Sequence, residues 1–310
     1  MTSRSKILLS LILIGIADVG FSHAMRSITL HARENVHDLW EVTVYKTVDS
    51  RSIEIVFPCE HKQIFQDTMV SRYEMKCSSA NSRTKFFEIN GFGDVITEAI
   101  INVSPLQDKE FSGVMTRDQP RFLFAKRTDL QVLQDFLGFG FEHVVFGWDH
   151  LVFLLGLVAL IGRLQKLLIL ATCFTLAHAL SIGMIYSDLI YLPSLLIEMG
   201  IALSIFAIGC EVAKGRLKNP YATCIGFGFI HGFGYGEALA EQQISADFSL
   251  LPLLGFNAGV ELSQIVIVCC SYALIKKLQT IFGPIFSKGL AYLIGSFGSL
   301  LFFSHVLGAI

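Results

Sequence analysis

The sequence predicts a polytopic α-helical membrane protein with about six transmembrane helices and an N-terminal exported β-rich domain. Three observations predict this fold class. Only 16% of the 310 residues are charged, whereas an ordinary soluble domain has roughly 25%. The mean hydropathy of the chain is +0.58. Long apolar segments fill the chain after about residue 135, and most of the charged residues lie before that point.

Residues 1–24 are predicted to be a signal peptide. Arg4 and Lys6 precede an apolar run from Ile7 to Ala17, which is shorter than the roughly 20 residues that a spanning helix needs. Ser22-His23-Ala24 supplies small residues at the −3 and −1 positions of a cleavage site. The alternative is an uncleaved first helix. Both interpretations send the residues that follow across the membrane.

Residues 25–130 are predicted to form an exported β-sandwich-like domain. Apolar and polar residues alternate over 40–45, 52–57 and 95–103, a period typical of half-buried strands. Cys59 and Cys77 are the cysteines of this region, and an exported domain meets an oxidising compartment, so a disulfide between them is expected. We expect a periplasmic or extracellular protein partner, if there is one, to contact this domain.

Residues 135–310 are predicted to form a six-helix transmembrane domain in contact with membrane lipid. Each apolar segment is long enough to cross a bilayer core of about 30 Å. The segments lack the alternation of barrel strands, so helices are the expected spanning structure. The predicted spans are residues 140–162, 167–186, 189–213, 221–240, 249–275 and 281–309.

The loops between these spans predict the orientation of the protein. Basic residues gather in alternate loops, at Arg163, Lys166, Lys214, Arg216, Lys218, Lys276, Lys277 and Lys288. The loops around 186–190 and 240–249 contain only acidic charges. The positive-inside rule places the basic loops in the cytoplasm, which agrees with an exported N-terminal domain. A bacterial inner membrane is the expected location, and a net charge of −2 without a basic block excludes a nucleic-acid partner.

Acidic and histidine side chains lie inside the predicted spans. Ionisable groups are costly in lipid and usually mark function, although one such side chain is more often part of a satisfied interhelical hydrogen bond. At 1.5 Å of rise per residue, five of the helices bring polar groups to one layer roughly 5–18 Å below the outer surface. These groups are His143, Asp149, His150, His178, Glu198, His231, Asn257 and Glu261.

The residue types in this layer indicate a metal site. Imidazole and carboxylate ligands suit zinc, nickel, iron or copper. The predicted metal ligands are His143, Asp149, His150, His178 and His231. Asp149 is a ligand, a partner that fixes a histidine tautomer, or a proton acceptor. Glu142, Glu237 and Asn257 are further intramembrane polar residues. The predicted metal is a divalent transition metal, nickel or zinc.

Several sequence blocks resemble one membrane-protein family. Residues 141–153, FEHVVFGWDHLVF, resemble the H-x5-D-H signature of HupE/UreJ proteins, with His143, Asp149 and His150 at the named positions. The blocks ending at His178, following Glu198, starting at His231 and covering 256–261 are similar to further blocks of its larger subgroup. The resemblance covers roughly 130–310. It implies permeation of nickel or a related metal and an exported N-terminal domain.

Three functions remain open at this point. The first is a nickel or transition-metal permease, which the resemblance favours. The second is an intramembrane metal-dependent hydrolase acting on lipid or lipoprotein, with zinc on three histidines and Asp149, Glu198 or Glu261 as general base. A polar layer open only to the outside favours this second function. The third is a non-catalytic membrane scaffold or sensor, in which the polar layer is structural. Whether the protein is an enzyme is therefore left open.

Overall fold

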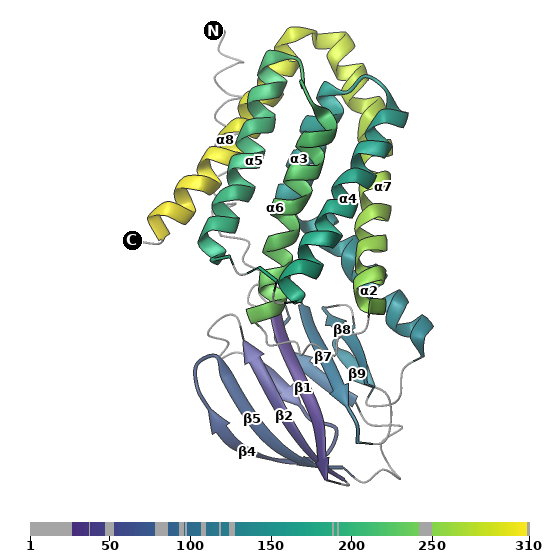
Figure 1. The fold of residues 1–310 in the computed structure, drawn as a ribbon, viewed down its shortest axis with the longest axis vertical. Helices are drawn as coiled ribbons and strands as arrows, with labels where there is room; N and C mark the ends of the chain where they lie inside the picture. The colour runs from purple at the N-terminus through teal and green to yellow at the C-terminus, as the bar shows by residue number, and fades with distance from the viewer. Residues whose placement is uncertain are drawn as a thin grey trace.

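The computed structural model describes residues 27–36, 38–46, 53–77, 86–92, 96, 98–106, 110–117, 119–123, 128–187, 189–190, 192–241 and 250–308. The predicted signal peptide, residues 1–24, lies outside the described residues. Within them, a β-rich N-terminal part is followed by seven helices. Figure 1 shows the strands gathered at one end of the helical bundle.

The described strands form two sheets. The larger sheet has the order β4-β5-β2-β1-β7-β8, and the smaller one has the order β3-β6-β9. β1 pairs with β7 in parallel, and the other pairs are antiparallel. The strands are β1 (Ser27–Val36), β2 (Leu39–Lys46), β3 (Glu54–Val56), β4 (Glu60–Gln66), β5 (Val70–Lys76), β6 (Phe86–Asn90), β7 (Glu98–Ser104), β8 (Phe111–Thr116) and β9 (Arg121–Leu123).

One hydrophobic core joins the two sheets. Alternate side chains of β2, Trp40, Val42 and Val44, are buried, because successive side chains of a strand point to opposite faces. Phe87 and Phe122 of the smaller sheet belong to the same core. The N-terminal region is therefore β-rich, as its alternating runs predict.

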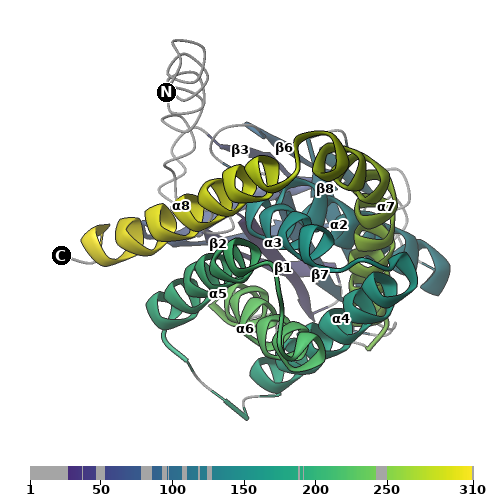
Figure 2. The same ribbon diagram turned by 90° about the horizontal axis from the view of Figure 1, so that it is seen from above.

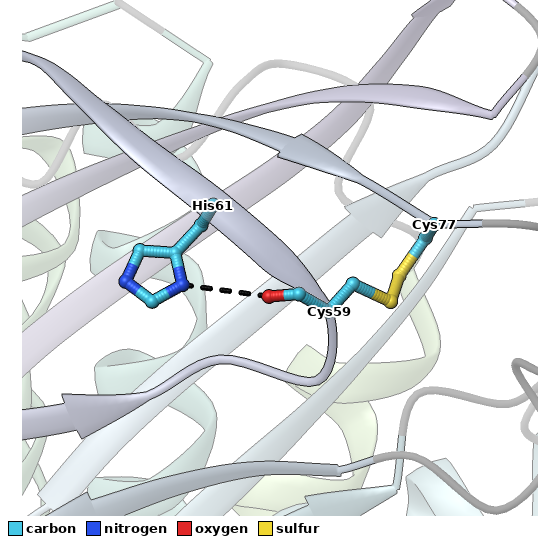
Figure 3. The surroundings of a disulfide bond; sticks show 3 residues. All are labelled: Cys59, His61 and Cys77. Carbon is cyan, nitrogen blue, oxygen red and sulfur yellow. Dashed lines mark hydrogen bonds between the residues drawn. A yellow bond between two sulfur atoms is a disulfide. The ribbon is translucent and has the colours of Figure 1, made fainter.

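A disulfide closes the hairpin of β4 and β5. Cys59 directly precedes β4 and Cys77 directly follows β5, and the structure joins them with their Cα atoms 5.4 Å apart. Figure 3 shows this bond together with His61, whose Nδ1 lies 3.4 Å from the carbonyl oxygen of Cys59. The bond holds the open end of the hairpin, where an edge strand would otherwise fray.

The seven described helices follow the last strand in the sequence. They are α2 (Asp129–Phe146), α3 (Trp148–Leu160), α4 (Leu164–Tyr186), α5 (Ser194–Lys214), α6 (Pro220–Glu241), α7 (Leu250–Phe282) and α8 (Pro284–Gly308). Thr128 starts α2 through a capping box, because its side chain accepts from the backbone N–H of Gln131 while the Gln131 side chain accepts from the backbone N–H of Thr128. α2 thus begins well before the predicted span at residue 140.

The first predicted span, 140–162, is not one helix. α2 and α3 meet at Gly147 with a bend of 69°, and only together do they pass as a broken span or re-entrant loop. Gly147 ends α2 and caps α3 in an extended conformation (φ −77°, ψ 98°). A continuous apolar composition does not reveal such a break, so the prediction of one continuous helix was wrong, while the two helices together can still form one broken span.

The structure leaves the predicted count of about six spans unconfirmed. Among the described residues, α4, α5, α7 and α8 are each long and apolar enough to cross a membrane, and the bent pair raises the count to five. α6 occupies the predicted fourth span without meeting that criterion. The glycines of α6, together with His231 and Glu237, lower its hydropathy.

The helices around α3 form three closely packed pairs. α4 packs on α6, α2 on α7, and α5 on α8. In each pair a glycine lies where an added Cβ would meet the backbone of the partner helix, as small residues allow in membrane helices. Examples are Gly232 against His178, Gly259 against Leu137 and Gly298 against Phe206. Figure 2 shows the short helix α3 ringed by the longer helices.

Side chains of α7 satisfy the far end of α3. The last carbonyl groups of a helix have no partner within the helix. Nζ of Lys276 and Nε2 of Gln279 lie 3.5 Å and 3.0 Å from the carbonyl oxygen of Ala159. The hydroxyl of Tyr272 donates to the carbonyl oxygen of Gly162 at 2.7 Å. α3 is therefore anchored at the end away from the sheets, while its first turn lies among the histidines.

Candidate metal centre

Four helices deliver the candidate ligands to one place. His143 lies in the last turn of α2, Asp149 and His150 lie in the first turn of α3, His178 lies on α4, and His231 lies on α6. The break at Gly147 matters here, because it turns the chain between His143 and His150 and sets both rings side by side. Their ring centroids are 4.8 Å apart.

The ligand atoms fall into two overlapping groups. His143, His150 and His178 form one group, and Asp149, His150 and His231 form the other. Within each group, one ligand atom per residue lies within 4.8 Å of the others. The two groups share His150. This arrangement has the ligand types and the proximity that a divalent transition metal requires.

Each of three histidines is held by a polar neighbour. Nδ1 of His178 lies 3.2 Å from Oδ1 of Asn257, and Nε2 of His231 lies 3.1 Å from Oγ of Ser204. Nδ1 of His150 lies 3.1 Å from Oδ1 of Asp149. Metal-binding histidines usually have such a partner on one ring nitrogen, which fixes the tautomer and the ring orientation.

The opposite ring nitrogens have no hydrogen-bond partner among the described residues. Buried polar atoms are almost always hydrogen-bonded, so each unpaired one needs an explanation. His150, His178 and His231 are 3%, 0% and 2% exposed. The unpaired atoms are Nε2 of His143, Nε2 of His150, Nε2 of His178 and Nδ1 of His231. A bound metal ion would satisfy nitrogens of this kind, and the donor set therefore fits a metal.

The first turn of α3 supplies the negative charge of the site. Oδ1 of Asp149 accepts from the backbone N–H of His150 at 2.9 Å, and Oδ2 lies 3.9 Å from Nδ1 of His231. A carboxylate in the first turn of a helix is favoured by the helix dipole. Asp149 lies between two imidazoles, where its carboxylate would offset the charge of a bound cation.

Aromatic side chains enclose the histidines. The Phe174 ring lies 5.8 Å from the His150 ring and 5.4 Å from the His231 ring. Tyr235 and Phe256 each lie 5.3 Å from the His143 ring and stack on one another at 4.0 Å. These rings surround the imidazoles with apolar surface, and low polarity would strengthen the attraction between a bound cation and its ligands.

Two predicted carboxylates of the layer have other partners. Glu198 on α5 forms an ion pair with His305 on α8, with Oε2 and Nδ1 2.9 Å apart. Glu261 on α7 accepts hydrogen bonds from Thr172 and Thr175 on α4, each at 2.6 Å. Neither carboxylate belongs to the two groups of candidate ligands. Asp149 is thus the proposed general base that contacts the histidines directly.

Glu142 and Glu237 lie on helices that carry candidate ligands, but neither belongs to the two ligand groups. Glu142 precedes His143 on α2, and Glu237 lies on α6 beyond Tyr235. The N-terminal part packs against the helices, because Ile100 of β7 and Val114 of β8 share a core with them. Burial, together with the carboxylate of Glu142, raises the pKa of Glu98 on β7 to about 8. Glu98 is therefore mostly protonated at neutral pH.

Sequence reasoning assigned no role to several residues around the site. Ser204 lies in the block after Glu198 that resembles the family, and this resemblance was the one sequence signal that pointed to Ser204. Thr172, Thr175 and Gln264 carried no comparable signal, because hydroxyl and amide side chains are ordinary in membrane helices. Their positions become informative only when the structure shows that α4 packs beside α7, which brings the two threonines next to Gln264 and Glu261.

The comparisons with known proteins agree with the sequence blocks. Residues 119–304 match the family described as HupE / UreJ protein, and this range is more than half of the chain. It contains all the candidate ligands. No curated protein and no solved structure matches the chain.

Proposed function

The chain belongs to the HupE/UreJ family, and from this premise we propose that it is a membrane permease for a divalent transition metal, nickel first and zinc second. The observation that carries the proposal is the set of four buried, unpaired imidazole nitrogens from α2, α3, α4 and α6. The metal is the transported substrate, and His143, Asp149, His150, His178 and His231 are its proposed ligands.

The broken span supports transport. Substrate sites of many transporters are formed by discontinuous helices, whose ends carry partial charges and unpaired backbone groups. The break between α2 and α3 lies between His143 and His150. A small change in the 69° bend would move these two residues relative to each other, which is a physical means of releasing a bound ion.

The charge distribution supports an orientation. The connections α3–α4, α5–α6 and α7–α8 lie at the end of the bundle away from the sheets (Figure 1). The basic residues of the predicted cytoplasmic loops lie in or beside them. We therefore propose that this end faces the cytoplasm of a bacterial inner-membrane protein and that the N-terminal part is exported behind a signal peptide.

The export proposal extends to the N-terminal part itself. A disulfide between Cys59 and Cys77 suits an oxidising compartment. Every residue of the edge strand β4 is exposed, and an exposed edge is a surface on which another chain can pair. We propose this domain as the contact for a protein partner on the outer side.

Uptake by liposomes tests the permease function. Purified protein in proteoliposomes should accumulate nickel, and His150→Ala should lower the initial rate at least about tenfold, because it removes a ligand shared by both groups. His305→Ala is the matched control, since His305 is a histidine of the bundle outside both groups, and it should keep most of the uptake.

The two remaining functions predict other results. A metal-dependent hydrolase, with Asp149 as base, would bind metal in the same centre without moving it across the bilayer. The carboxylate of Asp149, which is 25% exposed and lies beside His150, is the observation in favour of that function. A scaffold or sensor would keep its function in His150→Ala. Wild-type liposomes that take up no more nickel than His150→Ala liposomes would overturn the permease proposal.

A further inference from the structure

A second polar cluster lies beside the histidine centre, on the side away from the sheets, between helices α4 and α7. The contact of His178 with Asn257 joins α4 to α7. Thr175 lies three residues earlier on α4, and Glu261 lies four residues later on α7. Because α4 and α7 run in opposite directions, both steps lead about one helical turn away from the sheets.

Oxygen atoms alone form this cluster. Oε1 of Glu261 accepts from the hydroxyl of Thr172 and Oε2 accepts from the hydroxyl of Thr175, both at 2.6 Å. Oε1 of Gln264 lies 3.5 Å from the Thr175 hydroxyl. Thr175 and Gln264 are 6% and 1% exposed, Glu261 is partly buried, and Thr172 is exposed at the surface of the helical bundle. A carboxylate at this depth is costly, so its retention needs a reason.

The two threonines can turn from donors to the carboxylate into ligands for a cation. Oγ1 of Thr172 lies 3.2 Å from the carbonyl oxygen of Leu168, and Oγ1 of Thr175 lies 3.3 Å from that of Ala171. A hydroxyl has one proton and two lone pairs. If each proton rotates to its carbonyl oxygen, both hydroxyl oxygens and the carboxylate become free to contact a cation, and no proton is left unpaired.

We propose that Glu261, Thr172, Thr175 and Gln264 form a second cation site, which takes the divalent metal from the histidine centre on its way to the cytoplasm. This inference rests on the proposed permease function. Oxygen ligands hold nickel and zinc less tightly than imidazole does. A conducting path needs such a weaker site after a tight one, because the ion must also leave.

The test separates binding from movement. Glu261→Gln keeps the size of the side chain and removes its charge. It should lower the initial rate of nickel uptake into proteoliposomes at least about tenfold, since the second cation site loses its charged ligand. Nickel binding to the same purified variant, measured by equilibrium dialysis, should stay within about twofold of wild type, because the histidine centre keeps its ligands.

Two further variants complete the experiment. Glu211→Gln, on the surface end of α5 beside Lys214, is the matched control and should transport like wild type. Thr172→Val combined with Thr175→Val should slow uptake as Glu261→Gln does, and it keeps the charge. Normal nickel binding together with normal nickel uptake in Glu261→Gln or in the double threonine variant would contradict the proposal of a second cation site.

The remaining outcomes are also decisive. If Glu261→Gln folds but loses binding and uptake together, Glu261 belongs to the histidine centre and a separate inner site does not exist. If wild-type protein binds nickel but transports none, the proposed permease function is wrong, and the proposal of a second cation site, which depends on it, is wrong too. Wild-type transport with unaffected Glu261→Gln uptake removes the inner site alone.

Discussion

At the scale of single residues, the centre depends on side chains that contact no metal themselves. Ser204, Asn257 and Asp149 each occupy one ring nitrogen of a histidine and leave the other nitrogen facing the cluster. The orientation of each ring is therefore set before any ion arrives. This preorganisation distinguishes the centre from histidines that merely satisfy one another inside a bundle.

Removal of one of these partners should weaken metal binding without removing a ligand. Ser204→Ala frees Nε2 of His231, so we expect nickel affinity to fall by about 10- to 100-fold. Isothermal titration calorimetry of the purified variant measures this nickel affinity. Ser299→Ala, which removes a hydroxyl bonded to a carbonyl oxygen of α8, is the control. Equal affinities for both variants and wild type would contradict the positioning role.

The sequence predicts the depth of the site residues better than their direction. The fixed rise of a helix places His143, His178 and His231 at a similar depth once the ends of the spans are known. The rotation of each helix about its axis depends on packing, which no local pattern specifies. Glu198 and Glu261 thus share the predicted depth, yet they face His305, Thr172 and Thr175.

At the scale of elements, glycine decides how closely the helices approach. Gly228, Gly232 and Gly236 recur every four residues on α6 and face α4, the small-residue spacing of close membrane helix pairs. The glycine-rich run predicts such packing but not the partner helix. Gly147 is different, because it breaks a span that reads as continuous. The residues before Gly147 are apolar, and Trp148 and Asp149 follow it. No proline lies at the bend, so the sequence offers no signal for it.

A side chain at the contact of α4 with α6 should destabilise the bundle. A Cβ at position 232 would meet the Ser181 hydroxyl and the backbone of His178, so Gly232→Ala should lower the free energy of unfolding by about 1–3 kcal/mol. Gly226→Ala on the same helix meets nothing within 4 Å and should be neutral or slightly stabilising. Denaturant titration in detergent micelles measures the free energy of unfolding of the two variants. Equal values for Gly232→Ala and Gly226→Ala would contradict the close packing of α4 on α6.

At the scale of the whole molecule, the two ends of the bundle differ. The sheets cover the end nearest the histidine centre, and Glu98 of β7 approaches Glu142 there. The opposite end carries the basic connections. The composition of the chain predicts this division into a β-rich part and an apolar helical part, because charge content and periodicity change together near residue 130. How the two parts meet depends on side chains such as Ile100 and Val114, which no pattern singles out.

The most direct test of the account is the metal content of the purified full-length protein. After loading with nickel or zinc and exhaustive dialysis, elemental analysis should find at least one ion per wild-type chain. His150→Ala should retain much less, because both ligand groups share this residue. His305→Ala should match wild type. Wild-type protein with no more metal than His150→Ala would contradict the claim that these imidazoles bind a metal ion.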